Sequence, residues 1–154
     1  MVHEMSSVER IFQRILFYLK ILEKKIINVD PKNLVIIVEE VVDNKKLPIQ
    51  IHLSPPHWVV MRAKLIDGSE IRRIEGSEFI IFRELLRYSY KSAEFKFSLD
   101  DEYSIYITED IHFSALTFDV FDEEYHAIPA AAKLFWEKVF PEIKTLAEES
   151  KVIT

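Results

Sequence analysis

The spacing of hydrophobic residues changes along this chain from a helical period to a strand period and back. From residue 6 to about residue 28, apolar residues recur at alternating steps of four and three positions, which predicts an amphipathic helix. Ser6 and Glu9 have the spacing of a capping box, so we expect the helix to begin there. Asp30 is predicted to lie beyond its end, because the residue that precedes Pro31 is pushed out of the α region.

Three segments with a period of two follow this helix. Residues 34–42 are rich in β-branched side chains and apolar on both faces, whereas residues 47–54 alternate between apolar and polar positions. Residues 57–66 alternate in the same way, and a Pro-Pro pair separates them from the segment before. The polar stretch 43–46 is typical of a turn. The sequence therefore predicts three consecutive strands.

A second helix is predicted after a polar loop at residues 67–76. Ser77 is expected to cap this helix, which runs to about residue 92. Helical spacing predicts that its apolar residues are buried; they are Phe79, Ile80, Phe82, Leu85, Leu86 and Tyr90.

Two further strands and a last helix complete the pattern. Residues 95–99 and 103–107 alternate around an acidic turn at 100–102. Residues 112–121 fit either an extension of the sheet or a helix that Thr117 caps, and both alternatives stay open. Pro129 fits the first turn of a last helix, and Pro141 is expected to interrupt or restart that helix.

The order of elements predicts an α+β protein with the sequence α-βββ-α-ββ-α. We expect a mostly antiparallel sheet of five strands, flanked by three main helices. At 154 residues, the whole chain 1–154 is predicted to be a single domain.

Composition narrows the functional classes. A formal net charge of −6 argues against a general nucleic-acid binder, and the chain has no cysteine for disulfide or zinc–thiolate chemistry. No apolar run approaches the length of a membrane-spanning helix, and residues 1–10 do not have the pattern of a signal peptide, so we expect a cytoplasmic protein. Few Gly, Asn and Gln residues beside abundant Ile, Lys and Glu suggest the hypothesis of a thermophilic source.

Candidate chemistry is sparse. The five histidines, at positions 3, 52, 57, 112 and 126, show no metal-ligand spacing. The acidic clusters fall in predicted turns or helix starts, where carboxylates are favourable without any catalytic role. Gly68 and Gly76 are too few for a phosphate-binding loop. We therefore expect no catalytic residue, no cofactor and no metal, and a protein that is not an enzyme.

The outward face of the predicted sheet is a candidate surface for a partner. If helices cover one face, that face holds a set of inward residues: Ile36, Ile49, Val59, Met61, Phe95, Phe97 and Ile105. The opposite face then presents an apolar set, which is Val35, Ile37, Trp58, Val60 and Tyr106. An exposed apolar patch of this kind predicts a dimer or client-binding surface. The alternative is that a helix covers it as well.

A family resemblance rests on three stretches of the second half. They are the Glu84-Leu85-Leu86-Arg87 segment, the Leu-Asp-Asp-Glu turn within residues 97–105, and Ala115-Leu116-Thr117 before a long helix that ends in Phe140-Pro141-Glu142-Ile143. On these residues the chain resembles the YbjN-type proteins, whose fold is shared with class I type III secretion chaperones. The resemblance covers about residues 84–143, and the first third matches in the order of its elements.

The resemblance implies a small α+β domain, often a homodimer, that binds other polypeptides without catalysis. Two alternatives remain beside it. One is a small-ligand binder or enzyme with a cleft between helix 77–92 and the sheet. The other is RNA binding through a local basic patch of Arg62, Lys64, Arg72 and Arg73.

Overall fold

The computed structural model describes residues 5–74 and 78–152. The first helix, α1 (Ser7–Ile21), begins at the predicted capping box. The Ser6 backbone N–H donates to Glu9 Oε2 at 2.6 Å, and the Glu9 backbone N–H donates to Ser6 Oγ at 3.2 Å. These two bonds satisfy backbone donors that the first turn of a helix leaves without partners.

The predicted extent of the first helix is wrong at its C-terminal end. The helix ends at Ile21, and Glu23 takes a positive φ of 54°, which turns the chain. Residues Lys25–Asp30 then form strand β1, which pairs antiparallel with β2 and places Ile26 opposite Val38. The sheet therefore has six strands rather than five, because an exposed strand edge was available for this β-branched segment to pair with.

The rest of the sheet follows the predicted alternation. It adds β2 (Val35–Val42), β3 (Lys45–Ser54), β4 (Trp58–Ile66), β5 (Lys96–Leu99) and β6 (Ile105–His112). All pairs are antiparallel and the strand order is β1-β2-β3-β4-β6-β5. The β2–β3 hairpin turns at Asp43 and Asn44, whose φ angles of 49° and 63° are those of a two-residue hairpin loop. The predicted α+β class is confirmed.

Helices fill the remaining segments, with two differences from expectation. Part of the predicted loop 67–76 is a short helix, α2 (Gly68–Arg72), because the Asp67 side chain accepts from the Ser69 backbone N–H and caps it. Helix α3 spans Glu78–Lys91, and its predicted cap Ser77 lies outside the described residues. For residues 112–121, the helix alternative is correct: a 3₁₀ turn covers Phe113–Ala115 and α4 (Phe118–Leu134) follows.

Thr117 caps α4, as the helix alternative predicted. Its Oγ1 accepts a hydrogen bond from the Val120 backbone N–H at 3.2 Å. Because this cap starts the helix early, Pro129 lies inside α4 and not in a first turn, which corrects the prediction. The expected interruption at Pro141 does not occur: a π-helical segment (Phe135–Val139) leads without a gap into α5 (Phe140–Val152), whose second residue is Pro141. A proline has no N–H for the helical ladder, and a π turn accommodates the missing hydrogen bond.

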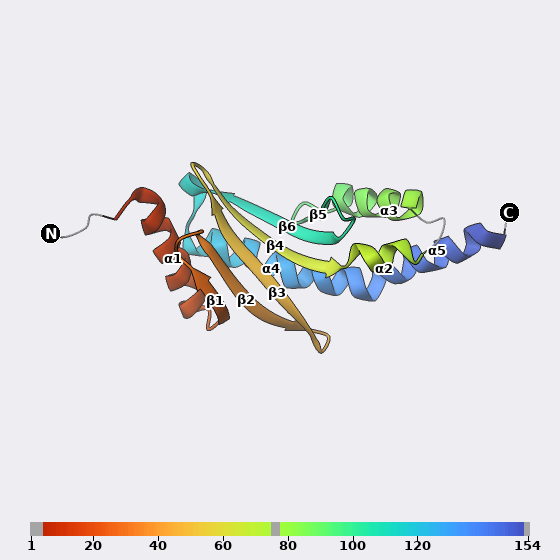
Figure 1. The fold of residues 1–154 in the computed structure, drawn as a ribbon, viewed down its shortest axis with the longest axis horizontal. Helices are drawn as coiled ribbons and strands as arrows, with labels where there is room; N and C mark the ends of the chain where they lie inside the picture. The colour runs from red at the N-terminus through yellow and green to blue at the C-terminus, as the bar shows by residue number, and fades with distance from the viewer. Residues whose placement is uncertain (1–4, 75–77, 153–154) are drawn as a thin grey trace.

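The helices lie on one face of the sheet. In Figure 1, α4 runs behind the strands and α5 continues beyond the end of the sheet, whereas no helix crosses the near face. The inward residues of the central strands are fully buried against α4, among them Ile36, Ile49, Val59 and Met61. Phe95 and Phe97 are only half-buried, because they belong to the short edge segment at β5. The main core therefore lies between the sheet and α4, and the opposite face stays open.

Candidate functional site

An uncovered apolar stripe runs along α3. Phe79 is 75% exposed, Leu86 is 70% exposed and Tyr90 is 91% exposed. The sequence-based expectation that these three residues are buried is wrong. The opposite side of the helix, with Ile81 and Leu85, is the side that packs inward. Since α3 lies at the edge of the sheet beside β5 and α5, only one of its apolar sides finds a neighbour within the described chain.

An apolar groove borders this stripe. It has a volume of about 210 Å³ and is lined by Phe82, Leu85, Leu86, Phe97, Ser98 and Leu99. The Phe82 ring stacks against Tyr103, with 6.4 Å between ring centroids, which extends the apolar surface to the β5–β6 turn. Ser98 is the only polar residue in the lining. This groove is the cleft in which an enzyme or a small-ligand site was expected, and its lining has no converging charged groups.

A buried carboxylate organises the basic residues on the flank of α3. Glu84 is almost fully buried and accepts hydrogen bonds from Arg87 at 2.8 and 2.9 Å. It also accepts a bond from Arg83 Nε at 3.1 Å. Tyr88 on the same helix donates to Glu142 at 2.5 Å, which ties α3 to α5, and burial raises the Tyr88 pKa to about 12. The helix is therefore fixed firmly in place while its apolar stripe faces outward.

All five residues of the predicted partner surface lie on the open face of the sheet. Their exposure is moderate, and Trp58, at 42%, is the most exposed of the three residues on β4 and β6. Polar residues separate them on the face of the sheet. His52 on β3 pairs with Val35 on one side and with Val60 on the other, and Gln50 on β3 is the cross-strand neighbour of Ile37. Tyr106 on β6 is paired directly with Lys64 on β4. The face is therefore a mixed surface and not the continuous apolar patch that the alternation pattern indicated.

A polar cavity of about 340 Å³ opens on this face, where β3, β4 and β6 meet the β5–β6 turn. Its lining residues are Gln50, Arg62, Ser98, Leu99, Asp100, Tyr106 and Thr108. Asp100 accepts from the backbone N–H groups of Glu102 and Ser104 at 3.0 and 2.9 Å. It also accepts from the Tyr106 hydroxyl at 3.1 Å. Sequence reasoning missed this cavity, because its residues come from four separate segments and only the strand register brings them together.

Hydrogen bonds determine the charge state of this cavity. Partial desolvation acts to raise the pKa of Asp100, but the bonds from Ser104, Tyr106 and Glu102 outweigh it and lower that pKa. Burial and the bond to Asp100 raise the pKa of Tyr106. At neutral pH the cavity therefore holds an ionised Asp100 and a neutral Tyr106.

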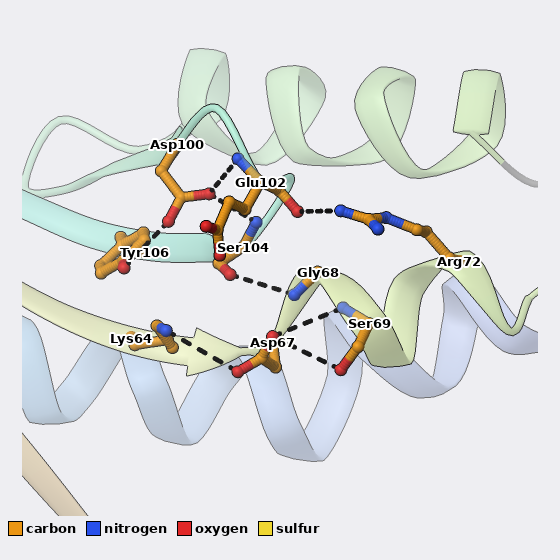
Figure 2. Close-up of polar contacts among 9 residues, drawn as sticks. All are labelled: Lys64, Asp67, Gly68, Ser69, Arg72, Asp100, Glu102, Ser104 and Tyr106. Carbon is orange, nitrogen blue, oxygen red and sulfur yellow. Dashed lines mark hydrogen bonds and ion pairs between the residues drawn. The ribbon is translucent and has the colours of Figure 1, made fainter.

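The end of the cavity connects to α2 through a polar cluster, which Figure 2 shows. The Gly68 backbone N–H donates to Ser104 Oγ at 3.0 Å, and Arg72 donates to the Glu102 carbonyl oxygen at 3.1 Å. Lys64 pairs with Asp67 at 3.7 Å. Lys64 and Arg72 from the predicted basic patch are therefore engaged with acidic or carbonyl oxygens, and they do not form a free cationic strip for RNA.

The four histidines within residues 5–74 and 78–152 do not gather at a metal site. His57 stacks on His112 with 5.3 Å between ring centroids, and the Trp58 ring meets His112 edge-on at 5.1 Å. His112 Nδ1 already accepts from the Ser114 backbone N–H at 3.1 Å. Across the described ranges 5–74 and 78–152, no group of three or more His, Cys, Asp or Glu side chains is placed to hold a metal ion. In the same ranges no helix is long and apolar enough to cross a membrane.

An acidic pair, Glu109 on β6 and Glu124 on α4, lies between the sheet and that helix. Glu109 on β6 points to the helix side of the sheet, is 8% exposed, and has one carboxylate oxygen without a hydrogen-bond partner. Burial, together with a shared hydrogen bond and repulsion from Glu124, raises the pKa of Glu109 to about 8. The pair therefore holds a proton at neutral pH, and it contributes a pH dependence that the alternation pattern of β6 did not indicate.

Comparison with known proteins relates the fold to two solved complexes. A chain in the crystal structure of the ExsC–ExsE complex matches with a TM-score of 0.63 and 12% identity, covering 88% of this chain and 97% of that chain. A chain in the structure of the HopA1–SchA chaperone–effector complex matches with a TM-score of 0.58 and 11% identity, covering 84% and 96%. The chain therefore shares the fold of the matched chain in each of these two complexes.

A third structure extends the comparison beyond these complexes. An uncharacterised protein from Methanothermobacter thermautotrophicus matches with a TM-score of 0.56 and 17% identity, covering 86% of this chain and 96% of that chain. No family model and no curated protein matches the sequence. At these identities the likeness concerns the fold, so the functional argument rests on the surfaces described above.

Proposed function

We propose that this protein is a non-catalytic, chaperone-like module that acts as a homodimer and binds another polypeptide. The observation that carries the proposal is the apolar stripe of α3, where Phe79, Leu86 and Tyr90 lie uncovered. Aromatic and aliphatic side chains this exposed are typical of protein interfaces. The proposal treats residues 1–154 as one domain of the YbjN-type and class I type III secretion chaperone kind, in agreement with the sequence resemblance.

A second copy of this chain is the partner that we assign to the α3 stripe. A stripe with such high exposure favours a partner that is always present, and another copy meets that condition. Two α3 helices packed antiparallel about Leu86 would bring the two Leu86 side chains together and place Tyr90 of one copy near Phe82 of the other, so that apolar groups meet. The apolar groove beside Leu86 would receive side chains from the second copy.

The polypeptide partner is assigned to the open sheet face. This face carries Val35, Ile37, Trp58, Val60 and Tyr106, interleaved with polar groups. A surface that mixes apolar and polar residues suits a partner that binds reversibly, because the protein remains soluble when this surface is unoccupied. The two roles therefore use two different surfaces.

Solution mass by light scattering tests the dimer. The wild type is expected to be a dimer, and Leu86→Glu is expected to be a monomer, since the charge would lie in the centre of the interface. Phe17→Glu introduces the same kind of change at an apolar residue of α1 that is 60% exposed, and should leave the dimer intact. A monomeric wild type, or a dimer that survives Leu86→Glu and separates in Trp58→Asp, would contradict this assignment.

Polypeptide binding is tested separately with an unfolded model protein. The wild type is expected to reduce the heat-induced aggregation of citrate synthase, measured by light scattering over time. Trp58→Asp should lose this effect while its own mass and circular dichroism stay those of the wild type. If Trp58→Asp protects as well as the wild type does, the sheet face is not the polypeptide-binding surface.

A further inference from the structure

The cavity on the open sheet face is built around one guanidinium. The register places Gln50 on β3 and Thr108 on β6 directly opposite Arg62 on β4, one on each side. Directly opposed residues have Cβ atoms about 5 Å apart, so an amide, a guanidinium and a hydroxyl lie in one row. Ser98 adds a second hydroxyl, 2.5 Å from Thr108 Oγ1. All of these residues lie on paired strands, which hold their positions without a ligand.

Arg62 differs from Lys64 and Arg72 because its side chain has no oxygen partner among the described residues. Lys64 is paired with Asp67, and Arg72 donates to the Glu102 carbonyl oxygen. Asp100 lines the same cavity, but its oxygens already accept bonds from Glu102, Ser104 and Tyr106. The charge of Arg62 acts on its surroundings, since burial and then repulsion from Arg62 lower the pKa of His52.

We propose that this cavity binds a carboxylate group, with Arg62 as the cationic ligand and Gln50 and Thr108 as additional donors. A planar guanidinium matches the two oxygens of a carboxylate. A doubly charged phosphate fits less well, because the ionised Asp100 in the lining repels the larger charge more strongly. The carboxylate comes either from a small free acid or from an Asp or Glu side chain of a bound polypeptide. The second source rests on the function proposed above.

The surroundings of Arg62 indicate how an acidic polypeptide would lie. Trp58, Val60 and Arg62 are alternate residues of β4 on the same face, at a rise of about 3.3 Å per residue. An extended segment along β4 would therefore place two apolar side chains over Trp58 and Val60 and an acidic one over Arg62. The predicted recognition pattern is apolar-x-apolar-x-Glu.

Nuclear magnetic resonance titration with sodium glutarate tests the free-acid source on the intact protein. Glutarate is expected to shift the amide signals of Arg62 and Thr108 with a Kd in the millimolar range, and Arg62→Gln should weaken binding about tenfold. Arg14→Gln removes the same charge from an exposed site on α1 and should bind like the wild type. Equal binding to Arg62→Gln would overturn the assignment of glutarate to this cavity.

A matched pair of peptides tests the polypeptide source. A peptide with the pattern Leu-Ser-Leu-Ser-Glu, blocked at both ends, should bind the wild type about tenfold more tightly than its Gln counterpart, and this preference should vanish in Arg62→Gln. A Glu preference that persists in Arg62→Gln would overturn the carboxylate site while leaving polypeptide binding intact. If only glutarate binds through Arg62, the carboxylate site stands and polypeptide binding on this face fails. If neither probe binds in an Arg62-dependent way, the carboxylate site is overturned.

Discussion

Gly68 lies against the backbone of Glu102 so closely that no side chain fits between them. A Cβ atom at position 68 would lie 1.8 Å from the Glu102 carbonyl oxygen and 3.0 Å from the Tyr103 carbonyl carbon. The Gly68 backbone N–H donates to Ser104 at this contact, as Figure 2 shows. The start of α2 thus packs directly on the backbone of the β5–β6 turn and bonds to the Ser104 hydroxyl, and this junction supports the end of the polar cavity.

Gly68→Ala is therefore expected to destabilise the fold. The new methyl group overlaps with backbone, which cannot rotate away as a side chain would, so we expect a loss of about 3 kcal/mol in the free energy of unfolding. Urea denaturation followed by circular dichroism measures it. Ser69→Ala, at the next and exposed position, should stay within about 0.5 kcal/mol of the wild type. Equal stability of Gly68→Ala and wild type would show that the two segments move apart easily.

A buried tyrosine connects α4 to the sheet. The hydroxyl of Tyr125, which is fully buried, donates to Glu40 Oε1 at 2.7 Å, and Lys24 pairs with the same oxygen at 2.9 Å. Tyr125→Phe removes one donor from a half-buried carboxylate, so we expect a loss of about 1–2 kcal/mol in unfolding free energy.

A double-mutant cycle with Glu40→Gln gives the coupling between the two side chains. Tyr18→Phe is the matched control. The Tyr18 ring packs on Phe118 and Phe121, and removing its hydroxyl leaves those ring contacts unchanged. Additive effects of Tyr125→Phe and Glu40→Gln would mean that the hydrogen bond contributes nothing measurable.

The buried acid Glu109 predicts a stability that falls as the pH rises. Its pKa is raised from 4.5 to about 8, so the folded state holds a proton that the unfolded state releases. The fold is therefore unaffected by this group below pH 4.5. It loses stability progressively between about pH 4.5 and 8, where the unfolded state releases the proton while the folded state still holds it.

Glu109→Gln should remove this pH dependence. The amide keeps the shape of the protonated acid and cannot ionise, so the variant is expected to be more stable than the wild type at pH 9 and similar to it at pH 4. Urea denaturation at a series of pH values measures the difference. Glu123→Gln removes an exposed carboxylate from α4 and should keep the wild-type slope. An unchanged slope in Glu109→Gln would place the titrating group elsewhere.

Pro129 inside α4 predicts a stabilising substitution. A proline within a helix lacks the N–H that would bond to the carbonyl four residues earlier, and its ring crowds that carbonyl. Pro129→Ala restores the donor, so we expect a gain of about 1–3 kcal/mol, measured by the shift of the urea midpoint. Pro31→Ala, in the turn between β1 and β2, should instead lower stability slightly, because it adds freedom to the unfolded chain. A loss of stability in Pro129→Ala would mean that the ring packs favourably.

Local signals were sufficient for most elements of the fold. The capping box at Ser6, the two-residue turn at Asp43-Asn44 and the cap at Thr117 each involve residues a few positions apart, so their chemistry is visible in the sequence. The residue at which α1 ends could not be predicted from such local signals. The segment Lys25–Asp30 has an apolar spacing that fits a helix, and pairing with β2, which is a nonlocal interaction, makes it a strand.

The same distinction applies to the candidate sites. The alternation of β2 and β4 predicted the face on which Val35, Ile37 and Val60 lie, because successive side chains of a strand must point to opposite sides. It did not predict that His52, Gln50 and Arg62 would interleave with them, since that depends on the register between strands.

By itself, the sequence determined the fold class, the position of most helices and strands, and the two faces of the sheet, because these follow from side-chain periodicity and local capping. Only the tertiary structure decided which apolar residues stay uncovered. Helix α3 is apolar on more than one side, and its place at the sheet edge buries Ile81 but leaves Leu86 and Tyr90 largely uncovered by the described residues. The cavity at Arg62 likewise exists only because pairing of distant strands places Gln50 and Thr108 on either side of it.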